Sequence, residues 1–262
     1  MKYFDSHAHY YDGRFSEELT EGVDRLIDSL LSSDVSCIVN VGTMPDTSRA
    51  AVAQAEKFTN MYTALGVHPT DTRFLSDMDA ALAETLDLIK DPASKCVALG
   101  EIGLDYHYPD TDRERQMRYF EAQMTLAREL DLPVVIHDRD AHGDVMEVIR
   151  RHRGVRGVLH SFSGSPEMAE ELVRLGYYIS FSGTLTFKNA RRPRECAAIL
   201  PHDRVLIETD APYLAPHPLR GTLNHSGNLV YTNAALASVW GIGEEECARI
   251  TEENAKNFFS IK

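Results

Sequence analysis

Histidines and carboxylates that could bind metal ions follow short apolar segments at widely separated places in this chain. His7 and His9 lie two residues apart, directly after an apolar segment near the N-terminus. Four further side chains of the same chemical kind each follow another apolar segment: Glu101, His137, His160 and Asp210. Imidazole and carboxylate groups are the ligands of divalent-metal hydrolases, in which the cation activates water. Six such residues at equivalent positions therefore predict a metal site with hydrolytic chemistry.

Eight segments with the composition of buried parallel strands alternate with helix-like segments along the chain. Several are continuous runs of Val, Ile and Leu, which is typical of strands covered by helices on both faces. The predicted strands are Tyr3–Ser6, Ser36–Val41, Tyr62–Gly66, Cys96–Gly100, Pro133–Ile136, Arg156–Leu159, Tyr177–Ser180 and Val205–Ile207. Eight strand–helix units in about 260 residues predict a (β/α)8 TIM barrel, formed as one domain over residues 1–262. An open doubly wound sheet is the alternative, although no Gly-x-Gly-x-x-Gly sequence follows the first strand to favour it.

Two helix starts can be predicted from capping residues. Thr111 and Glu114 have the spacing of a capping box, which predicts a helix that begins after Thr111. Ser165-Pro166 predicts the start of another helix, because Pro is favoured at the first helical position, and Gly176 predicts its end.

The barrel fold would bring the six candidate metal ligands together. Catalytic groups of such barrels lie at the C-terminal ends of the strands. Since side chains alternate along a strand, His7 and His9 should lie on one face, toward the barrel axis. We expect Glu101 to end the fourth strand, where its two oxygens could bridge two cations. Each residue alone is more simply a hydrogen-bonded histidine or a helix cap, but the joint pattern favours one metal site.

Composition narrows the class of protein further. The formal charge of −13 over 262 residues argues against an extended nucleic-acid footprint, but not against an enzyme that binds a strand end through metal ions and a local basic patch. No apolar run approaches the length of a membrane span, about 20 residues, and no signal peptide is visible. Four scattered cysteines predict reduced, buried thiols in a cytosolic protein: Cys37, Cys96, Cys196 and Cys247.

The same residues, in the same order, resemble the motifs of the TatD family of metal-dependent deoxyribonucleases, within the amidohydrolase superfamily. The resemblance covers nearly the whole chain and is specific because six motifs occur together. They are DSHAH at 5–9, GVHP at 66–69, GEIGLDY at 100–106, PVVIH at 133–137, HSFSG at 160–164 and ETDAPYL at 208–214.

The resemblance implies a particular arrangement of two divalent cations, Mg2+, Mn2+ or Zn2+. His7, His9, Glu101 and Asp210 would hold one cation, and Glu101, His137 and His160 would hold the second. Glu101 would bridge them, in the place that a carboxylated lysine takes in many superfamily relatives. It also implies a (β/α)8 barrel that hydrolyses DNA phosphodiesters from a 3′ end, with a two-metal-activated water. Glu101 and Asp210 would be catalytic, with Asp210 accepting the proton of that water.

Other residues are candidates for substrate contacts. His68, Lys188 and Arg220 are predicted to bind substrate, and Phe187 could stack on a base within the basic stretch 186–194. Glu208 could orient a ligand histidine. We also expect three residues that follow Glu101 to line the cleft: Asp105, Tyr106 and His107. The predicted partner is therefore the end of a DNA strand, with no membrane and no obligate protein partner.

One loop departs from the family pattern and leaves the substrate open. Within Arg220–Val230, Thr222 replaces the usual lysine, and His225-Ser226 replaces a Glu-Pro pair. The change removes one positive and one negative charge from a loop expected beside the metal site. A small-molecule hydrolase of phosphotriesters, lactones or amides is therefore an alternative, and a metal-binding module without turnover is a second one.

Overall fold

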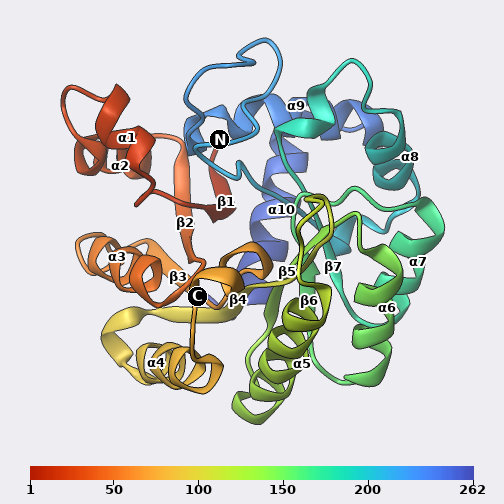
Figure 1. Ribbon diagram of the computed structural model, residues 1–262. Helices are drawn as coiled ribbons and strands as arrows, with labels where there is room; N and C mark the ends of the chain where they lie inside the picture. The colour runs from red at the N-terminus through yellow and green to blue at the C-terminus, as the bar shows by residue number, and fades with distance from the viewer.

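The fold is built from eight parallel strands whose spatial order is their order in the sequence (Figure 1). The computed structural model describes residues 1–262. The strands are β1 (Tyr3–Ala8), β2 (Val35–Gly42), β3 (Met61–Leu65), β4 (Cys96–Asp105), β5 (Val134–Arg139), β6 (Gly157–Leu159), β7 (Tyr178–Phe181) and β8 (Val205–Ile207). All eight predicted strands are confirmed, although β1, β4 and β5 run further than the sequence predicted.

The first and last strands meet, so the sheet curls into a nearly closed barrel. Ala8 and Ala211 form a parallel bridge, and the backbone N–H of Asp210 donates to the carbonyl of His7 at 2.9 Å. Ser6 Oγ donates to the carbonyl of Ile207 at 3.0 Å, one layer deeper. The prediction of a (β/α)8 TIM barrel is confirmed, and the alternative of an open sheet is wrong.

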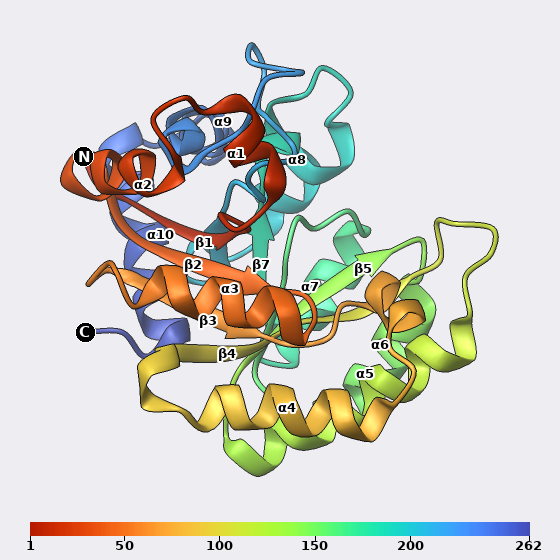
Figure 2. The ribbon, with the colours of Figure 1, turned by 60° about the vertical axis from the view of Figure 1, so that its left-hand side comes forward.

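Helices surround this barrel on its outer face, as the two ribbon views show (Figures 1 and 2). They are α1 (Gly13–Glu18), α2 (Val23–Ser32), α3 (Pro45–Ala55), α4 (Met78–Lys90), α5 (Arg113–Leu130), α6 (His142–Arg151), α7 (Pro166–Arg174), α8 (Arg191–Ile199), α9 (Leu229–Trp240) and α10 (Glu244–Phe259). Five short 3-10 helices lie between these elements: η1 (Pro69–Phe74), η2 (Pro92–Ser94), η3 (Gly183–Thr186), η4 (His202–Arg204) and η5 (Ser226–Asn228).

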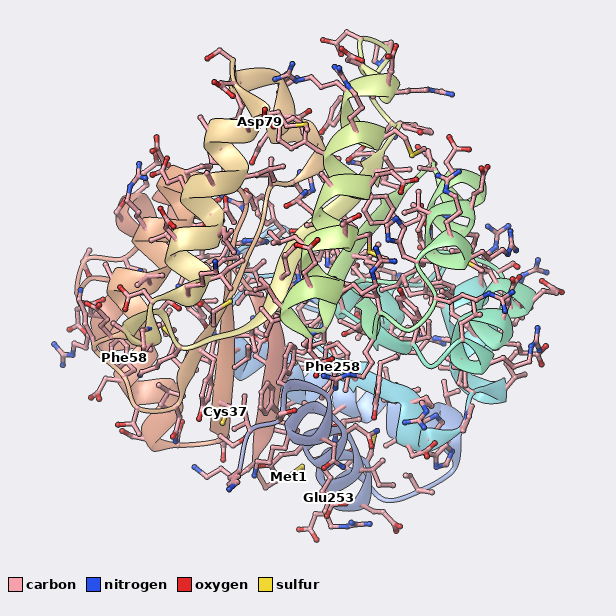
Figure 3. The ribbon with its side chains drawn as sticks, turned by 90° about the horizontal axis from the view of Figure 1, so that it is seen from below. Met1, Cys37, Phe58, Asp79, Glu253 and Phe258 are labelled. Carbon is pink, nitrogen blue, oxygen red and sulfur yellow. The ribbon has the colours of Figure 1, made fainter.

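The apolar core has an outer layer and a barrel interior. The largest cluster, 34 buried residues, packs between the sheet and the helices around it. A second cluster of 12 buried residues includes Val39 and Val41, which point inward from β2, together with Phe258 of α10. Phe259 stacks on Phe4 with ring centroids 5.8 Å apart, so α10 closes the barrel at the end where the strands begin. Figure 3 shows the barrel from its side, with Cys37 and Phe258 labelled at this end, in the lower part of the view. The polar candidate residues lie at the opposite end of the barrel.

One of the two predicted helix starts was displaced. Helix α5 begins at Arg113, and its N-cap is Asp112, whose side chain accepts from the N–H of Arg115 at 2.9 Å. The predicted cap at Thr111 was therefore wrong by one residue, because the next residue is an equally good capping acceptor. The prediction for α7 is confirmed, since Ser165 caps the helix and Gly176, with φ +90°, follows its end.

All four cysteines are free thiols, as predicted. Cys37, Cys196 and Cys247 are buried, and Cys96 is partly buried. No helix has both the length and the apolar character needed to cross a membrane. A cytosolic location stays a prediction.

Candidate metal centre

An irregularity in β4, where the Gly100–Glu101 peptide bond is cis, accompanies the inward direction of Glu101. Leu99 faces the outer core, and simple alternation would point Glu101 the same way. The register between β4 and β5 shifts between Gly100 and Ile102, so Ile102 takes the outward direction and Glu101 the inward one. Strand irregularities such as bulges commonly re-aim side chains in this manner next to active sites. The prediction that Glu101 ends its strand was wrong, since β4 continues to Asp105.

The four histidines reach the same end of the barrel from three strands. A register shift between Asp5 and Ala8 lies beside His7 in β1, and His9 follows the strand directly. His137 lies inside β5 rather than after it, and His160 follows β6 as predicted. Their side chains therefore meet at the C-terminal ends of the strands.

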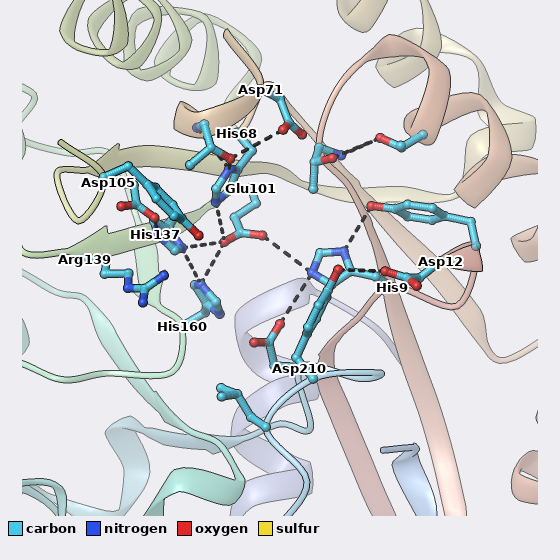
Figure 4. Close-up of a pocket in the computed structure, with 17 residues that line it drawn as sticks. His9, Asp12, His68, Asp71, Glu101, Asp105, His137, Arg139, His160 and Asp210 are labelled. Carbon is cyan, nitrogen blue, oxygen red and sulfur yellow. Dashed lines mark hydrogen bonds and ion pairs between the residues drawn. The ribbon is translucent and has the colours of Figure 1, made fainter. Parts of the chain in front are cut away.

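Each oxygen of Glu101 faces its own group of imidazole nitrogens (Figure 4). Oε2 lies 3.3 Å from His7 Nε2 and 3.7 Å from His9 Nε2. Oε1 lies 2.9 Å from His137 Nδ1 and 2.8 Å from His160 Nε2. The Glu101 carboxylate thus lies between two groups of imidazole nitrogens, which is the arrangement needed to bridge two cations.

Asp210 lies beside the first of these groups, which is formed by His7 and His9. Its Oδ1 lies 3.5 Å from His9 Nε2 and 3.7 Å from His7 Nε2. Three overlapping sets of ligand atoms, each set within 4.8 Å, include all six predicted ligands and also His68. The structure therefore brings together every residue that the sequence singled out as a ligand.

The outward nitrogens of three histidines are held by hydrogen bonds. His9 Nδ1 donates to the carbonyl of Val41 at 2.7 Å, and His160 Nδ1 donates to Glu208 Oε1 at 3.2 Å. His137 is turned the other way, with Nε2 donating to Asp105 Oδ2 at 3.1 Å. In each ring the remaining nitrogen faces Glu101, and after loss of its proton it would offer a lone pair to a cation there, as in known metal sites. This donor set fits divalent cations.

His68 lies at the site but differs from the other histidines. Its Nδ1 accepts from the backbone N–H of Thr70 at 3.2 Å, so its proton is on Nε2, which lies 3.4 Å from Glu101 Oε1. A protonated Nε2 is a hydrogen-bond donor and not a metal ligand. The position of His68 alone would allow coordination, but in this tautomer it presents an N–H toward the site.

Both site carboxylates are held in the ionised form. Burial opposes the charge of Glu101, but the imidazoles of His160, His68 and His7 outweigh it and keep its pKa well below the usual value. Burial likewise opposes ionisation of Asp210, and the hydrogen bond with His9, together with the nearby imidazoles, lowers its pKa. Ionised carboxylates are the form that binds a cation.

The metal centre lies at the bottom of a cleft of about 550 Å3. Asp105 lines this cleft as expected, but Tyr106 and His107 do not. The Tyr106 hydroxyl donates to Asp144 at 2.8 Å, and His107 pairs with Asp140 at 2.9 Å, so both are directed elsewhere.

Arg139 is a residue of the cleft that the sequence analysis missed. It is the only Lys or Arg among the residues that line the cleft, and Figure 4 shows it beside His137 and His160. The sequence could have indicated Arg139, because it lies two residues beyond His137 and therefore on the same face of the strand. Lys188 and Arg220 are exposed and are not part of this lining.

The loop that departs from the family pattern stabilises the turn that carries Asp210, through buried side chains outside the cleft. Asn224 is buried, and its Nδ2 donates to two carbonyls of the turn that carries Asp210, at 2.9 and 2.7 Å. Ser226 is also buried and donates to a carboxylate of β1 at 2.6 Å. Neither Thr222 nor His225 lines the cleft. The effect of the two missing charges on substrate choice stays a prediction.

Comparison with known proteins agrees with this geometry. The family model described as "TatD related DNase" matches residues 4–260. An uncharacterized metal-dependent hydrolase, YabD of Bacillus subtilis, is 38% identical over 98% of this chain and 99% of its own length. Another, TatD of Mycobacterium tuberculosis, is 36% identical over 91% of each chain. The crystal structure of the TatD homologue YjjV from Escherichia coli superposes with a TM-score of 0.91 at 30% identity, covering 99% of this chain and 98% of that one.

The barrel and its histidine–carboxylate cluster define a metal-dependent hydrolase. This chain belongs to the TatD family.

Proposed function

We propose that this protein is a deoxyribonuclease that removes nucleotides from a DNA strand end with two divalent cations. His7, His9, Glu101 and Asp210 would hold one cation, and His137 and His160 the other, with Glu101 shared. The observation that carries this proposal is the presence of two groups of imidazole nitrogens, one facing each oxygen of Glu101.

The bound cations would supply a water of lowered pKa and positive charge against the phosphate. Side chains of the protein would transfer the proton and bind the phosphate oxygens. Asp210, ionised and at the cleft floor, would accept the proton of the attacking water and return it to the leaving oxygen. His68 Nε2–H and the Arg139 guanidinium are the donors placed to bind phosphate oxygens.

The cleft suits a nucleotide more than a small neutral ester. Tyr11, Tyr108 and Tyr213 line it, and aromatic faces stack on bases. Arg139 adds a charge that favours anionic substrates. Mg2+, Mn2+ and Zn2+ are all compatible with the mixed imidazole and carboxylate ligands.

The test is a substrate panel on protein stripped with chelator and reloaded with Mg2+, Mn2+ or Zn2+. The panel holds 3′-labelled single- and double-stranded DNA, lactones and phosphotriesters. We expect metal-dependent release of mononucleotides that disappears in Glu101→Ala and persists in Glu129→Ala, an exposed carboxylate in the last turn of α5. Turnover of a lactone or phosphotriester with inert DNA would refute the proposal.

A second variant separates the roles of the two carboxylates. Asp210→Asn should retain bound metal, measured by elemental analysis of the dialysed protein, while losing almost all turnover. Retention of most of the rate in this variant would show that Asp210 is not the proton acceptor.

A further inference from the structure

Two adjoining cavities, which we treat as two lobes of one cleft, meet at the metal centre. The first, which we call the tyrosine lobe, is the cavity of about 550 Å3 that contains Tyr11, Tyr108 and Tyr213. The second, which we call the hydroxyl lobe, has about 370 Å3 and is lined by Ser161, Ser163 and Thr184 among others. Arg139, His137, His160 and Asp210 line both lobes. A substrate whose reacting bond lies at the metal centre would extend into both.

The tyrosine lobe offers aromatic faces at its rim. Tyr108 and Tyr213 are 46% and 44% exposed, which is unusual for large apolar rings. Tyr213 is fixed in place, because its hydroxyl donates to Asp12 at 2.7 Å and the guanidinium of Arg14 lies 4.0 Å from its ring centroid. Rigid exposed rings are suited to stacking on a base.

Acidic side chains limit what else this lobe can hold. Asp12, Asp71 and Asp105 form part of its wall, against the single positive charge of Arg139. Such a wall repels a run of phosphates beyond the one at the metal centre. The tyrosine lobe therefore fits one nucleoside and not a longer strand.

The hydroxyl lobe borders a cluster of positive charge. Thr184, in η3, and Pro193, in α8, line the lobe, and the chain between them is strongly basic. We call this cluster the basic rim, and its members are all exposed: Lys188, Arg191, Arg192, Arg194 and Arg220. Phe187 lies under Arg220, with 3.8 Å between the guanidinium carbon and the ring centroid.

The basic rim stands out from the rest of a chain with a formal charge of −13. No acidic residue occurs in the segment 186–194. Arg192 makes no ion pair, whereas its neighbour Arg191 pairs with Glu195 at 3.5 Å. Arg192 also directly precedes Pro193, which lines the hydroxyl lobe.

We propose that the cleft is polarised: the terminal nucleoside occupies the tyrosine lobe, and the rest of the DNA strand leaves through the hydroxyl lobe across the basic rim. This inference rests on the proposed deoxyribonuclease function. In this arrangement an acidic protein would bind DNA only near one edge of its site. Hydrolysis would release single nucleotides, because the acidic wall would stop the strand from passing through the tyrosine lobe.

The first test measures strand binding without turnover. A fluorescent decathymidylate with hydrolysis-resistant phosphorothioate linkages is titrated with metal-loaded protein, and its anisotropy is followed over a range of salt concentrations. Arg192→Glu should weaken binding on the order of 10-fold and reduce the salt slope by about 0.7 per lost phosphate contact. Arg153→Glu is the matched control, since Arg153 is exposed, makes no ion pair and lies in the loop before β6, at the other end of the barrel.

The second test compares a long and a short substrate. In Arg192→Glu the ratio of kcat/KM for decathymidylate to that for thymidine 5′-(p-nitrophenyl phosphate) should fall. In Tyr108→Ala, kcat/KM for the thymidine ester should fall about 10-fold, from lost stacking, while that for methyl p-nitrophenyl phosphate changes less.

Two outcomes would overturn the proposal in distinguishable ways. DNA hydrolysis by the wild-type protein with equal behaviour of Arg192→Glu and Arg153→Glu would refute the polarised cleft and leave the deoxyribonuclease function standing. Failure of the wild-type protein both to bind the phosphorothioate strand and to hydrolyse DNA would refute the two together.

Discussion

Replacement of Glu208 by glutamine tests how the chain prepares a histidine for metal binding. Glu208 follows β8 and is fully buried. Its Oε1 accepts from His160 Nδ1 at 3.2 Å and from the backbone N–H of Ser161 at 2.7 Å. Its Oε2 is buried and has no hydrogen-bond partner. Glutamine keeps the shape and one accepting oxygen, so the main change at His160 is the loss of the negative charge.

That charge increases the basicity of the His160 imidazole, and its loss should weaken the metal bond. Removal of such an outer partner typically costs 10–100-fold in metal affinity, which corresponds to about 1.4–2.8 kcal/mol. Metal affinity should fall at the site formed by His137 and His160, and it should not change at the site formed by His7 and His9. We therefore expect only one of two binding events to weaken.

Isothermal titration of the chelator-stripped protein with Mn2+ or Zn2+ measures this directly. Glu171→Gln is the control, because it also removes a carboxylate but on the surface, where Glu171 pairs with Arg150 at 2.7 Å. Equal affinities for the wild-type protein and Glu208→Gln, or equal weakening in both variants, would refute the role of Glu208.

Three other predictions follow from the backbone, the cysteines and a surface histidine. Gly103→Ala should destabilise the protein by at least about 2 kcal/mol in urea unfolding, because φ is +131° and a Cβ would lie 2.1 Å from the carbonyl oxygen of His137; Gly143→Ala, which meets nothing within 4 Å, should not. Burial raises the pKa of the Cys96 thiol to about 11, so a thiol reagent at about pH 8 should react with it only after unfolding, and fast reaction in the native state would contradict this. The hydrogen bond from His142 to Asp138 raises the pKa of His142, so His142 contributes stability at low pH that is lost as the pH rises through that raised value. His142→Ala should therefore lower the melting temperature more at about pH 5.5 than at about pH 8.5, and a larger effect at the higher pH would show the sign to be wrong.

The barrel could be predicted from the sequence because each strand is an almost continuous apolar segment. The candidate ligands could be predicted because a parallel barrel places all strand C-termini at one end. His160 and Asp210 illustrate this, since each follows its strand as predicted.

The direction of Glu101 could not be predicted from alternation. Leu99, Glu101 and Gly103 have the same parity, and the irregularity between Gly100 and Ile102 separates their directions. Such an irregularity depends on pairing with β5, which is a tertiary contact. Similarly, the sequence does not show that Asn224 and Ser226 of the altered loop face the core.

The central claim is that the two oxygens of Glu101 face two cation sites. The most direct measurement is anomalous diffraction from crystals soaked in Mn2+, combined with metal content by elemental analysis. We expect two peaks on either side of Glu101, one near His7 and His9 and one near His137 and His160, and the loss of both in Glu101→Ala. A single peak, or two peaks that persist unchanged in Glu101→Ala, would contradict it.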